Sequence, residues 1–186
     1  PHPVGYMFQR DHLLEWRNIL SNACLGLEIR GDLTPASREN VRQMLVQYGL
    51  EEFVGHRPSQ LSGGMRQRAA LVRTLALQPE LLLLDEPFSA LDYQTRLTVA
   101  DDIWRILRDS CKTAVLVTHD ISEAISLGDR VLVLSARPGR ILYDIRTDFG
   151  AERSPLSVRN HPAFSVYFRQ IWHALTEQKG VSYDTP

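Results

Sequence analysis

Two consecutive carboxylates follow an apolar run near the middle of the chain. Four leucines at residues 81–84 lead directly into Asp85 and Glu86. Such a run is typical of a strand buried on both faces, and strands of open α/β sheets present ligands at their carboxyl ends. There, one carboxylate can hold Mg²⁺ while the next polarises an attacking water. For this motif alone, a solvated acidic turn is the alternative.

A second motif combines a helix start with two glycines. Ser62 precedes Gly63 and Gly64, and a helical pattern follows. The first turn of a helix has unpaired N–H groups and a partial positive charge, and glycine lets a phosphate approach closely. The alternative is an ordinary helix capped by Ser62, but paired glycines in a first turn disfavour helix formation and weaken that interpretation.

The elements that must position these residues change character along the chain. Helical spacing dominates up to residue 78. Within this region, Thr34 and Pro35 form a typical helix start. Strands and helices then alternate, and this order predicts a parallel sheet with right-handed crossovers. The predicted helices are 11–26, 35–48, 62–76, 95–107, 121–127 and 163–176, and the predicted strands are 4–8, 81–84, 114–117, 131–134 and a hairpin strand at 141–145, with a polar loop at 149–162.

Composition restricts the function classes. The 186 residues are 44% hydrophobic and 23% charged with a net charge of −1, which predicts an ordinary globular protein and argues against a broad nucleic-acid-binding surface. Apolar runs are too short to cross a membrane, and the first residues show no signal-peptide pattern. Cys24 and Cys111 lie far apart in the sequence, so we expect two small core side chains in a reducing cytosol.

The motifs together resemble the ATP-binding cassette (ABC) ATPases. In chain order, Gln9 resembles the Q-loop glutamine, residues 61–65 the signature motif, residues 81–86 the Walker B strand with its catalytic glutamate, residues 89–92 the D-loop, and His119 the switch histidine. Any one of these is weak, but five in the right order and spacing are not. The resemblance implies an α/β, P-loop NTPase-like parallel sheet flanked by helices, with an α-helical signature subdomain.

The same resemblance predicts the division of the chain. We expect residues 1–186 to form a partial ABC ATPase domain, with residues 10–78 as the helical subdomain. Residues 1–9 and 79–150 would belong to the RecA-like core, and residues 151–186 would form a C-terminal loop and helix.

The family also implies a role for each matching residue in the binding of ATP and Mg²⁺. Asp85 would hold Mg²⁺ through water, and Glu86 would be the general base. His119 would contact the γ-phosphate and link it to Glu86, and Gln9 would sense Mg²⁺ and the attacking water.

The remaining motif residues imply a second ATP-binding subunit. Asp92 would contact this opposite subunit, whose bound ATP would meet Ser62, Gly63 and Gly64. Sites of this kind form only when two subunits meet head to tail.

One motif of the family is missing from the sequence. The only lysines, Lys112 and Lys179, follow Cys111 and Gln178, so no Gly-Lys pair of a Walker A loop exists. We expect a piece that lacks its N-terminal portion and, alone, binds ATP poorly and does not hydrolyse it. The alternative is a degenerate, non-catalytic ABC module that contributes only its signature motif in trans to an intact partner.

The segment after Gln9 points to a subtype. Residues 10–19, above all Leu14-x-Trp16, resemble the importers of nitrate, sulfonates and taurine. This implies transmembrane permease subunits, an indirect link to a substrate-binding protein, no nucleic-acid partner, and a peripheral place on the cytoplasmic face of the inner membrane. Leu13, Leu14 and Trp16 would contact a permease helix, although Trp16 is equally compatible with the subdomain core.

The distance between two motifs argues against another subtype of the family. Only 51 residues separate Gln9 from Leu61, which disfavours the ABC ATPases that carry long coiled coils there. The transported solute, and whether the second subunit is identical, stay open.

Overall fold

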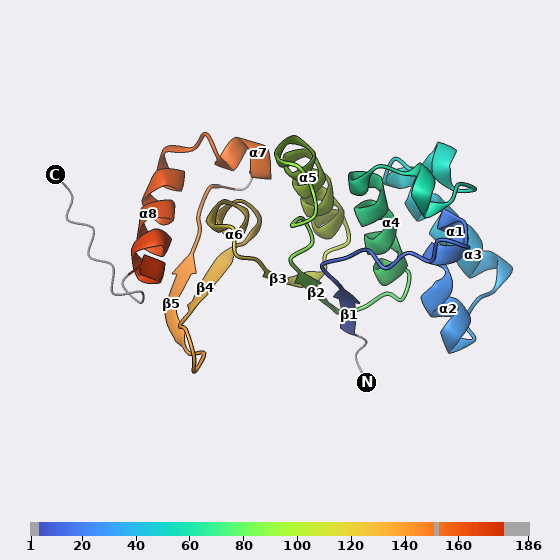
Figure 1. Ribbon diagram of the computed structural model, residues 1–186, viewed down its shortest axis with the longest axis horizontal. Coiled ribbons are helices and arrows are strands. Elements are labelled where there is room, and N and C mark those ends of the chain that lie inside the picture. Colours follow the sequence, from blue (N-terminus) through green and yellow to red (C-terminus); the bar gives the residue numbers. More distant parts are fainter. Residues whose placement is uncertain (1–3, 151–152, 177–186) are drawn as a thin grey trace. The chain divides into compact units, whose positions relative to one another are not determined.

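The computed structural model describes residues 4–150 and 153–176 of the chain and divides it into two compact units, residues 1–117 and 118–186. The parts of the predicted C-terminal loop and helix at residues 151–152 and 177–186 lie outside the described residues. Figure 1 gives the element labels, and each unit is treated by itself below.

The first unit is built on a parallel sheet in the order β1-β2-β3. Its strands are β1 (Val4–Met7), β2 (Leu81–Asp85) and β3 (Thr113–Val117). The register pairs Met7 with Leu84 and Asp85 with Val117. All three strands therefore end at the same edge of the sheet. Gln9 and Glu86 each follow a strand, as the sequence predicts, and the structure shows that these strands are neighbours.

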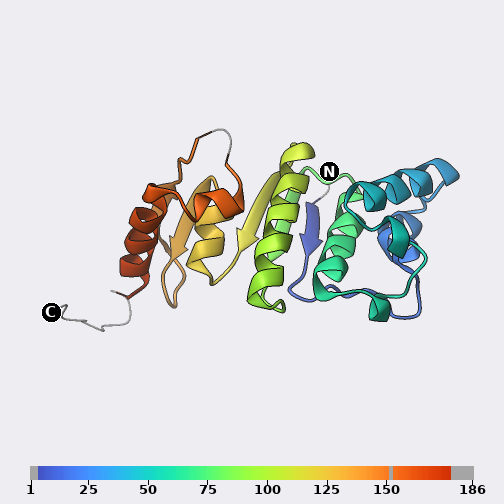
Figure 2. The ribbon, with the colours of Figure 1, turned by 90° about the horizontal axis from the view of Figure 1, so that it is seen from above.

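Two long helices accompany this sheet (Figure 2). Helix α4 (Gly63–Leu75) packs against β1 and against α5 (Tyr93–Asp109), which connects β2 to β3. The core at these contacts contains Leu71, Leu82 and Phe88, all fully buried. Ser62 caps α4 at the predicted start, whereas α5 begins two residues before the predicted start at residue 95, because the Asp92 side chain caps it.

Smaller helices surround α4. They are α1 (Ile19–Ala23), α2 (Leu25–Arg30), α3 (Pro35–Gln47) and the 3₁₀ turns η1 (Glu51–Phe53) and η2 (Pro58–Gln60). Thr34 and Ser37 form a reciprocal capping box at the start of α3, which confirms the predicted start at Pro35.

The predicted helix over residues 11–26 is wrong in its first half, because regular helix begins only at Ile19. The fully buried Asn22 explains the difference. Its side chain accepts from the Leu14 N–H at 2.7 Å and donates to the Leu14 carbonyl at 3.1 Å and the Arg17 carbonyl at 3.2 Å. These bonds satisfy the backbone of a non-helical segment.

Two expectations for the strands are also wrong. β3 is not buried on both faces, because Val115 and Val117, which share one face of the strand, are 47% and 55% exposed. β4 (Arg130–Leu134) is not in the parallel sheet of β2 and β3; it pairs antiparallel with β5 (Ile141–Arg146) in a sheet of its own, which confirms the predicted hairpin strand. A short turn joins these two strands, so their pairing is local.

In its described part, the second unit contains this hairpin and three helices. They are α6 (Ile121–Leu127), α7 (Pro155–Val158) and α8 (Pro162–Thr176). Ile125, Val131, Ile145 and Ile171 form its core. Helix α7 lies in the stretch predicted to be loop.

The two cysteines differ. Cys24 is buried as expected, whereas Cys111 is exposed and has a left-handed backbone. None of the helices among the described residues is long and apolar enough to cross a membrane.

Leu13 and Trp16 differ in burial, so their removal should affect the free energy of unfolding to different degrees. Leu13 is 6% exposed, so Leu13→Ala should lower the free energy of unfolding by about 2–4 kcal/mol. Trp16 is 72% exposed, so Trp16→Ala should change it by less than about 0.5 kcal/mol. Urea denaturation followed by circular dichroism measures both, and a large loss for Trp16→Ala would contradict the packing described here.

Candidate functional site

The polar side chains at the carboxyl edge of the sheet contact one another in pairs. Gln9 donates from Nε2 to Oε2 of Glu86 at 3.2 Å. Tyr6 donates from its hydroxyl to Oδ2 of Asp85 at 2.8 Å, and this bond, with smaller effects of burial and of the Asp85 charge, raises the pKa of Tyr6. The structure thus brings together three of the predicted site residues, each from a strand end.

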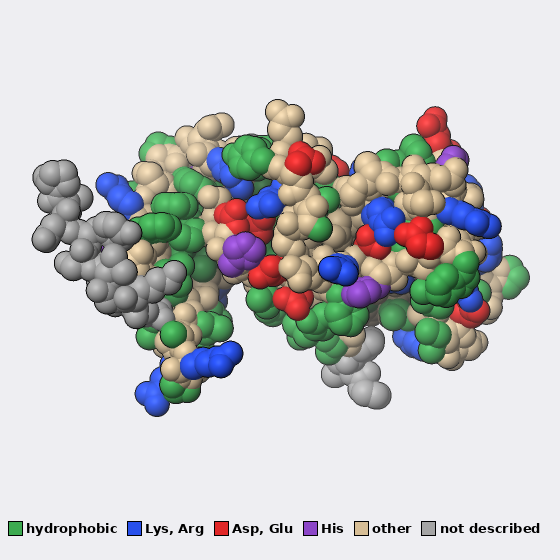
Figure 3. Space-filling model, in the orientation of Figure 1, with side chains coloured by type: hydrophobic (Ala, Val, Ile, Leu, Met, Phe, Trp, Pro, Cys, Tyr) green, Lys and Arg blue, Asp and Glu red, His purple; other side chains and the backbone are tan. Residues whose placement is uncertain are grey.

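Sequence analysis missed Tyr6. The signal was the alternation of β1, which places Tyr6 on the same face as Val4. Val4, Tyr6 and Phe8 are 55%, 43% and 51% exposed, and hydrophobic side chains gather over β1 in Figure 3. The Tyr6 hydroxyl lies on a face whose other side chains are apolar, and it binds the Asp85 carboxylate.

The backbone of Glu86 is unusual. Its φ is 44°, in the left-handed region that costs a non-glycine residue about 1–2 kcal/mol. The turn is fixed on both sides: the Glu86 N–H donates to the Val117 carbonyl at 2.8 Å, and the Glu86 carbonyl accepts from the Ser89 N–H at 3.2 Å and hydroxyl at 3.0 Å. Glu86 is therefore held in a strained conformation directly after β2.

The start of α4 has a packing reason for its glycines. Ser62 accepts from the Met65 N–H at 3.3 Å. A Cβ at Gly63 would lie 2.9 Å from Leu91, and one at Gly64 would lie 2.6 Å from Val99 of α5. Anion approach, which the sequence indicated for both, is thus not the only requirement: Gly64 is needed for the contact of two helices.

Asp92 and His119 lie in local structures of their own. Asp92 caps α5 and is exposed, and bonds from the side chain and N–H of Thr95 lower its pKa. His119 is exposed and belongs to the second unit, where Asp120 caps α6. The link from His119 to Glu86 would join the two units and stays a prediction.

The predicted partner surface needs one correction. Leu13 is buried and so belongs to the interior of the subdomain, whereas Leu14 is half-buried and Trp16 is exposed. Of the two interpretations of Trp16, the core interpretation is wrong. Leu14 and Trp16 remain the accessible part of the predicted contact.

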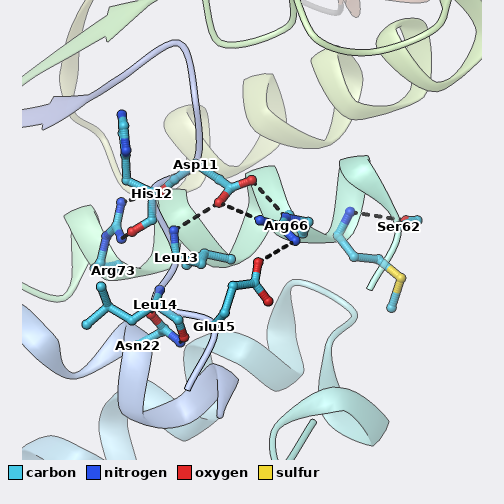
Figure 4. A network of polar contacts seen from close by, with 10 residues as sticks. Asp11, His12, Leu13, Leu14, Glu15, Asn22, Ser62, Arg66 and Arg73 are labelled. Atoms are coloured by element: carbon cyan, nitrogen blue, oxygen red, sulfur yellow. Dashed lines mark hydrogen bonds and ion pairs between the residues drawn. The ribbon is translucent and has the colours of Figure 1, made fainter. Parts of the chain in front are cut away.

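The segment after Gln9 is fastened to α4 (Figure 4). Arg66 donates to Asp11 from Nε at 2.8 Å and from Nη2 at 3.2 Å, and its Nη1 lies 3.0 Å from Glu15. Arg73 donates to the carbonyls of Asp11 at 2.6 Å and His12 at 2.7 Å. Burial alone would raise the pKa of Asp11, but the bonds from Arg66 and from the Leu13 N–H, with the charges of Arg66 and Arg73, hold it below its ordinary value.

The donor atoms at the sheet edge fit Mg²⁺ only as part of a shared site. Carboxylate and amide oxygens of Asp85, Glu86 and Gln9 are hard ligands of the kind that Mg²⁺ prefers. Across residues 4–150 and 153–176, no group of three or more His, Cys, Asp or Glu side chains can hold a metal. Magnesium commonly binds one or two carboxylates and takes its other ligands from water and substrate phosphates.

Comparison with known proteins places this geometry in a family. Residues 1–89 match the family described as ABC transporter. The chain is 47% identical over 176 residues to the uncharacterized ABC transporter ATP-binding protein YtlC of Bacillus subtilis, covering 94% of this chain and 67% of the relative. It is 39% identical to the taurine import ATP-binding protein TauB of Yersinia pestis, covering 95% and 71%. The chain belongs to the ABC transporter ATP-binding proteins.

A solved structure confirms the fold. It is the dimeric, post-hydrolysis structure of the ATP-binding cassette MJ0796 bound to ADP and Pi. The two sequences are 31% identical and the TM-score is 0.63; the match covers 80% of this chain and 65% of that one. The predicted α/β ABC ATPase fold, with its parallel sheet and helices, is therefore right. This ABC chain spans about two thirds of the length of the relatives that it matches.

The two glycines of α4 should respond differently to alanine. Gly64→Ala places a Cβ 2.6 Å from the stiff, buried Val99, so we expect a loss of about 1–3 kcal/mol in the free energy of unfolding. Gly63→Ala meets only the end of the flexible Leu91 side chain, so its loss should be below about 1 kcal/mol. Thermal unfolding compares them, and equal losses would contradict the packing role of Gly64.

Asp11 makes stability depend on pH. Its folded-state pKa lies below the unfolded value of about 3.9, so its contribution is present above that value and is lost as pH falls through the folded pKa. Asp11→Asn should therefore lower the free energy of unfolding by about 1 kcal/mol at neutral pH, allowing for solvent screening, and the difference from wild type should vanish in acid.

Urea denaturation at several pH values tests this. Asp32→Asn, which removes an exposed pairing with Arg30 at 3.0 Å, is the matched control and should show little change. A difference between Asp11→Asn and wild type that grows toward low pH would reverse the sign and refute the assignment.

Proposed function

We propose that this chain is the part of an ABC importer's ATP-binding subunit that carries the catalytic carboxylate and the signature helix. The observation that carries the proposal is the contact of Gln9 with Glu86, two predicted site residues that lie 77 positions apart in the sequence. The reaction is hydrolysis of ATP by attack of water on the γ-phosphate. Bound Mg²⁺ supplies charge neutralisation of the phosphate oxygens.

Glu86 is the general base of the proposed reaction. Its carboxylate accepts a proton from the attacking water, and Gln9 limits the orientations that this carboxylate adopts. The strained backbone and its bonds to Val117 and Ser89 keep the carboxylate at the sheet edge. Asp85 would hold Mg²⁺ through water, and the Tyr6 hydroxyl donates to one oxygen of the Asp85 carboxylate.

The other predicted residues act between subunits or between units. Ser62, Gly63 and Gly64, at the start of α4, meet a phosphate bound to an opposite subunit, and Asp92 faces the same contact; Ser62 and Gly63 are exposed, whereas Gly64 is buried. The exposed Ser62 and Asp92 side chains are compatible with such an interface. His119, whose side chain is exposed, binds the γ-phosphate.

The importer assignment rests on the segment after Gln9. Leu14 and Trp16 provide the apolar surface that receives a permease helix, and a Trp side chain that is 72% exposed is a common anchor of an interface. Similarity to taurine import ATP-binding proteins favours a small sulfonate as the solute, taken from a substrate-binding protein. The subunit would lie peripherally on the cytoplasmic face of the inner membrane.

A pair of ATPase measurements tests the catalytic proposal. This chain alone should show no Mg-ATP turnover because it lacks a Gly-Lys pair. The coding DNA upstream of the Pro1 codon should encode G-x-x-x-x-G-K-[ST] in frame, and the protein that includes it should hydrolyse ATP. Glu86→Gln in that protein should lower kcat about 100-fold or more while ATP binding is kept.

Glu51→Gln, a change at an exposed carboxylate of η1, is the matched control and should keep full turnover. Turnover by the present chain that Glu86→Gln abolishes would refute the need for the missing loop. If the upstream DNA encodes no such loop, the non-catalytic module that acts in trans replaces this proposal. Loss of growth on taurine but not on sulfate as the sulfur source, after deletion of the gene, tests the solute class.

A further inference from the structure

Arg73 binds the backbone of the segment after Gln9 at two successive carbonyls. Its two Nη groups donate to Asp11 at 2.6 Å and to His12 at 2.7 Å. His12 has a φ of 47°, which a non-glycine residue adopts only where the surroundings impose it. Both carbonyls face the guanidinium because of this turn, so Arg73 selects one conformation of the segment.

Arg66 binds the same segment through a side chain. It makes two bonds to the Asp11 carboxylate, at 2.8 and 3.2 Å, and the other Asp11 interaction, from the Leu13 N–H at 2.9 Å, closes a tight local turn. Arg66 and Arg73 are seven positions apart on α4, which is two helical turns, so they lie on the same face of this helix. The segment is therefore held at two points along α4 (Figure 4).

We propose that Arg66 and Arg73 are positioning residues that make residues 10–14 and helix α4 one rigid body and thereby set the position of Gln9. Two residues of chain reach at most about 7 Å, so Gln9 cannot move far while Asp11 is held. The side chain of Gln9 in turn contacts Glu86. A displacement of α4 therefore moves the amide that orients the Glu86 carboxylate.

The same body includes the exposed surface of Leu14 and Trp16. Asn22 of α1 fixes both the N–H and the carbonyl of Leu14, and Arg66 also reaches Glu15 at 3.0 Å. A partner that displaces Trp16 thus acts on a segment bound to α4, whose N-cap is Ser62. One set of arginine contacts links the partner surface, the start of the signature helix and Gln9.

This inference deepens the proposed function, because Gln9, Glu86 and Ser62 are its candidate residues. Its test measures no turnover, so its failure would leave the ATPase assignment untouched. The test uses the whole chain and two local readouts: the side-chain amide resonances of Gln9 and the exchange of backbone amides in residues 10–14. The Gln9 resonances are identified by their loss in Gln9→Glu.

In wild type, we expect the Gln9 side-chain amide at a position shifted by its bond to Glu86. Arg73→Met should return it to the position of a free amide and speed backbone exchange in residues 10–14 at least about tenfold, with α3 unchanged. Arg66→Met, at a partly exposed side chain, should do the same more weakly, and Arg73→Lys should restore part of the protection. Arg42→Met, which removes an exposed pair with Glu39 on α3, is the matched control.

Two outcomes would overturn the proposal. The first is a folded Arg73→Met protein with unchanged Gln9 resonances and unchanged exchange in residues 10–14. The second, which decides the matter if Arg73→Met does not fold, is an Arg66→Met protein that loses global stability without any local change at Gln9. A merely structural role of the arginines predicts that second pattern, because it lowers protection throughout the unit.

Discussion

The parallel pairing of β1 with β2 is the constraint on which the site depends. The two strands are separated by more than seventy residues of sequence, yet their register sets Met7 beside Leu84. Side chains alternate along a strand, so a shift of one residue would turn Leu82 and Leu84 out of the core and move Asp85 to the opposite face. The burial of these two leucines therefore fixes which carboxylate faces Tyr6 and where the chain turns into Glu86. Hydrophobic packing in the middle of β2 thus positions polar chemistry at its end.

Much of this arrangement could be read from the sequence because its signals are local. The starts of α3 and α4 follow from Thr34 and Ser62, each of which caps its helix through its own side chain. The apolar run before Asp85 marks β2 without reference to anything else in the chain. Gln9 and Glu86 each follow a predicted strand, so the sequence places both at strand ends, but that β1 lies beside β2 is seen only in the structure.

The rest depends on contacts between distant residues. Asn22 replaces the first turns of the predicted helix by binding the backbone at Leu14, and no periodicity reveals such a bond. Leu13 and Trp16 both look like face residues at helical spacing, but the non-helical segment buries the first and exposes the second. The Tyr6 bond to Asp85 and the contact of Gly64 with Val99 also require the packed structure. Packing against Val99 thus adds a requirement for glycine at position 64 that its place in a phosphate-binding motif does not predict.

Glu86 shows why the strained positions of this fold point to function. Glycine would adopt a φ of 44° freely, and stability alone would favour it at this turn. A glutamate in this conformation has an energetic cost, and the hydrogen bonds to Val117 and Ser89 hold it there despite that cost. The same turn places a carboxylate next to Gln9, whose segment is held by Arg66 and Arg73 on a different helix. The strained backbone of Glu86 and the fixed segment after Gln9 thus position the same two side chains, those of Gln9 and Glu86. Neither feature would be needed to keep the sheet folded.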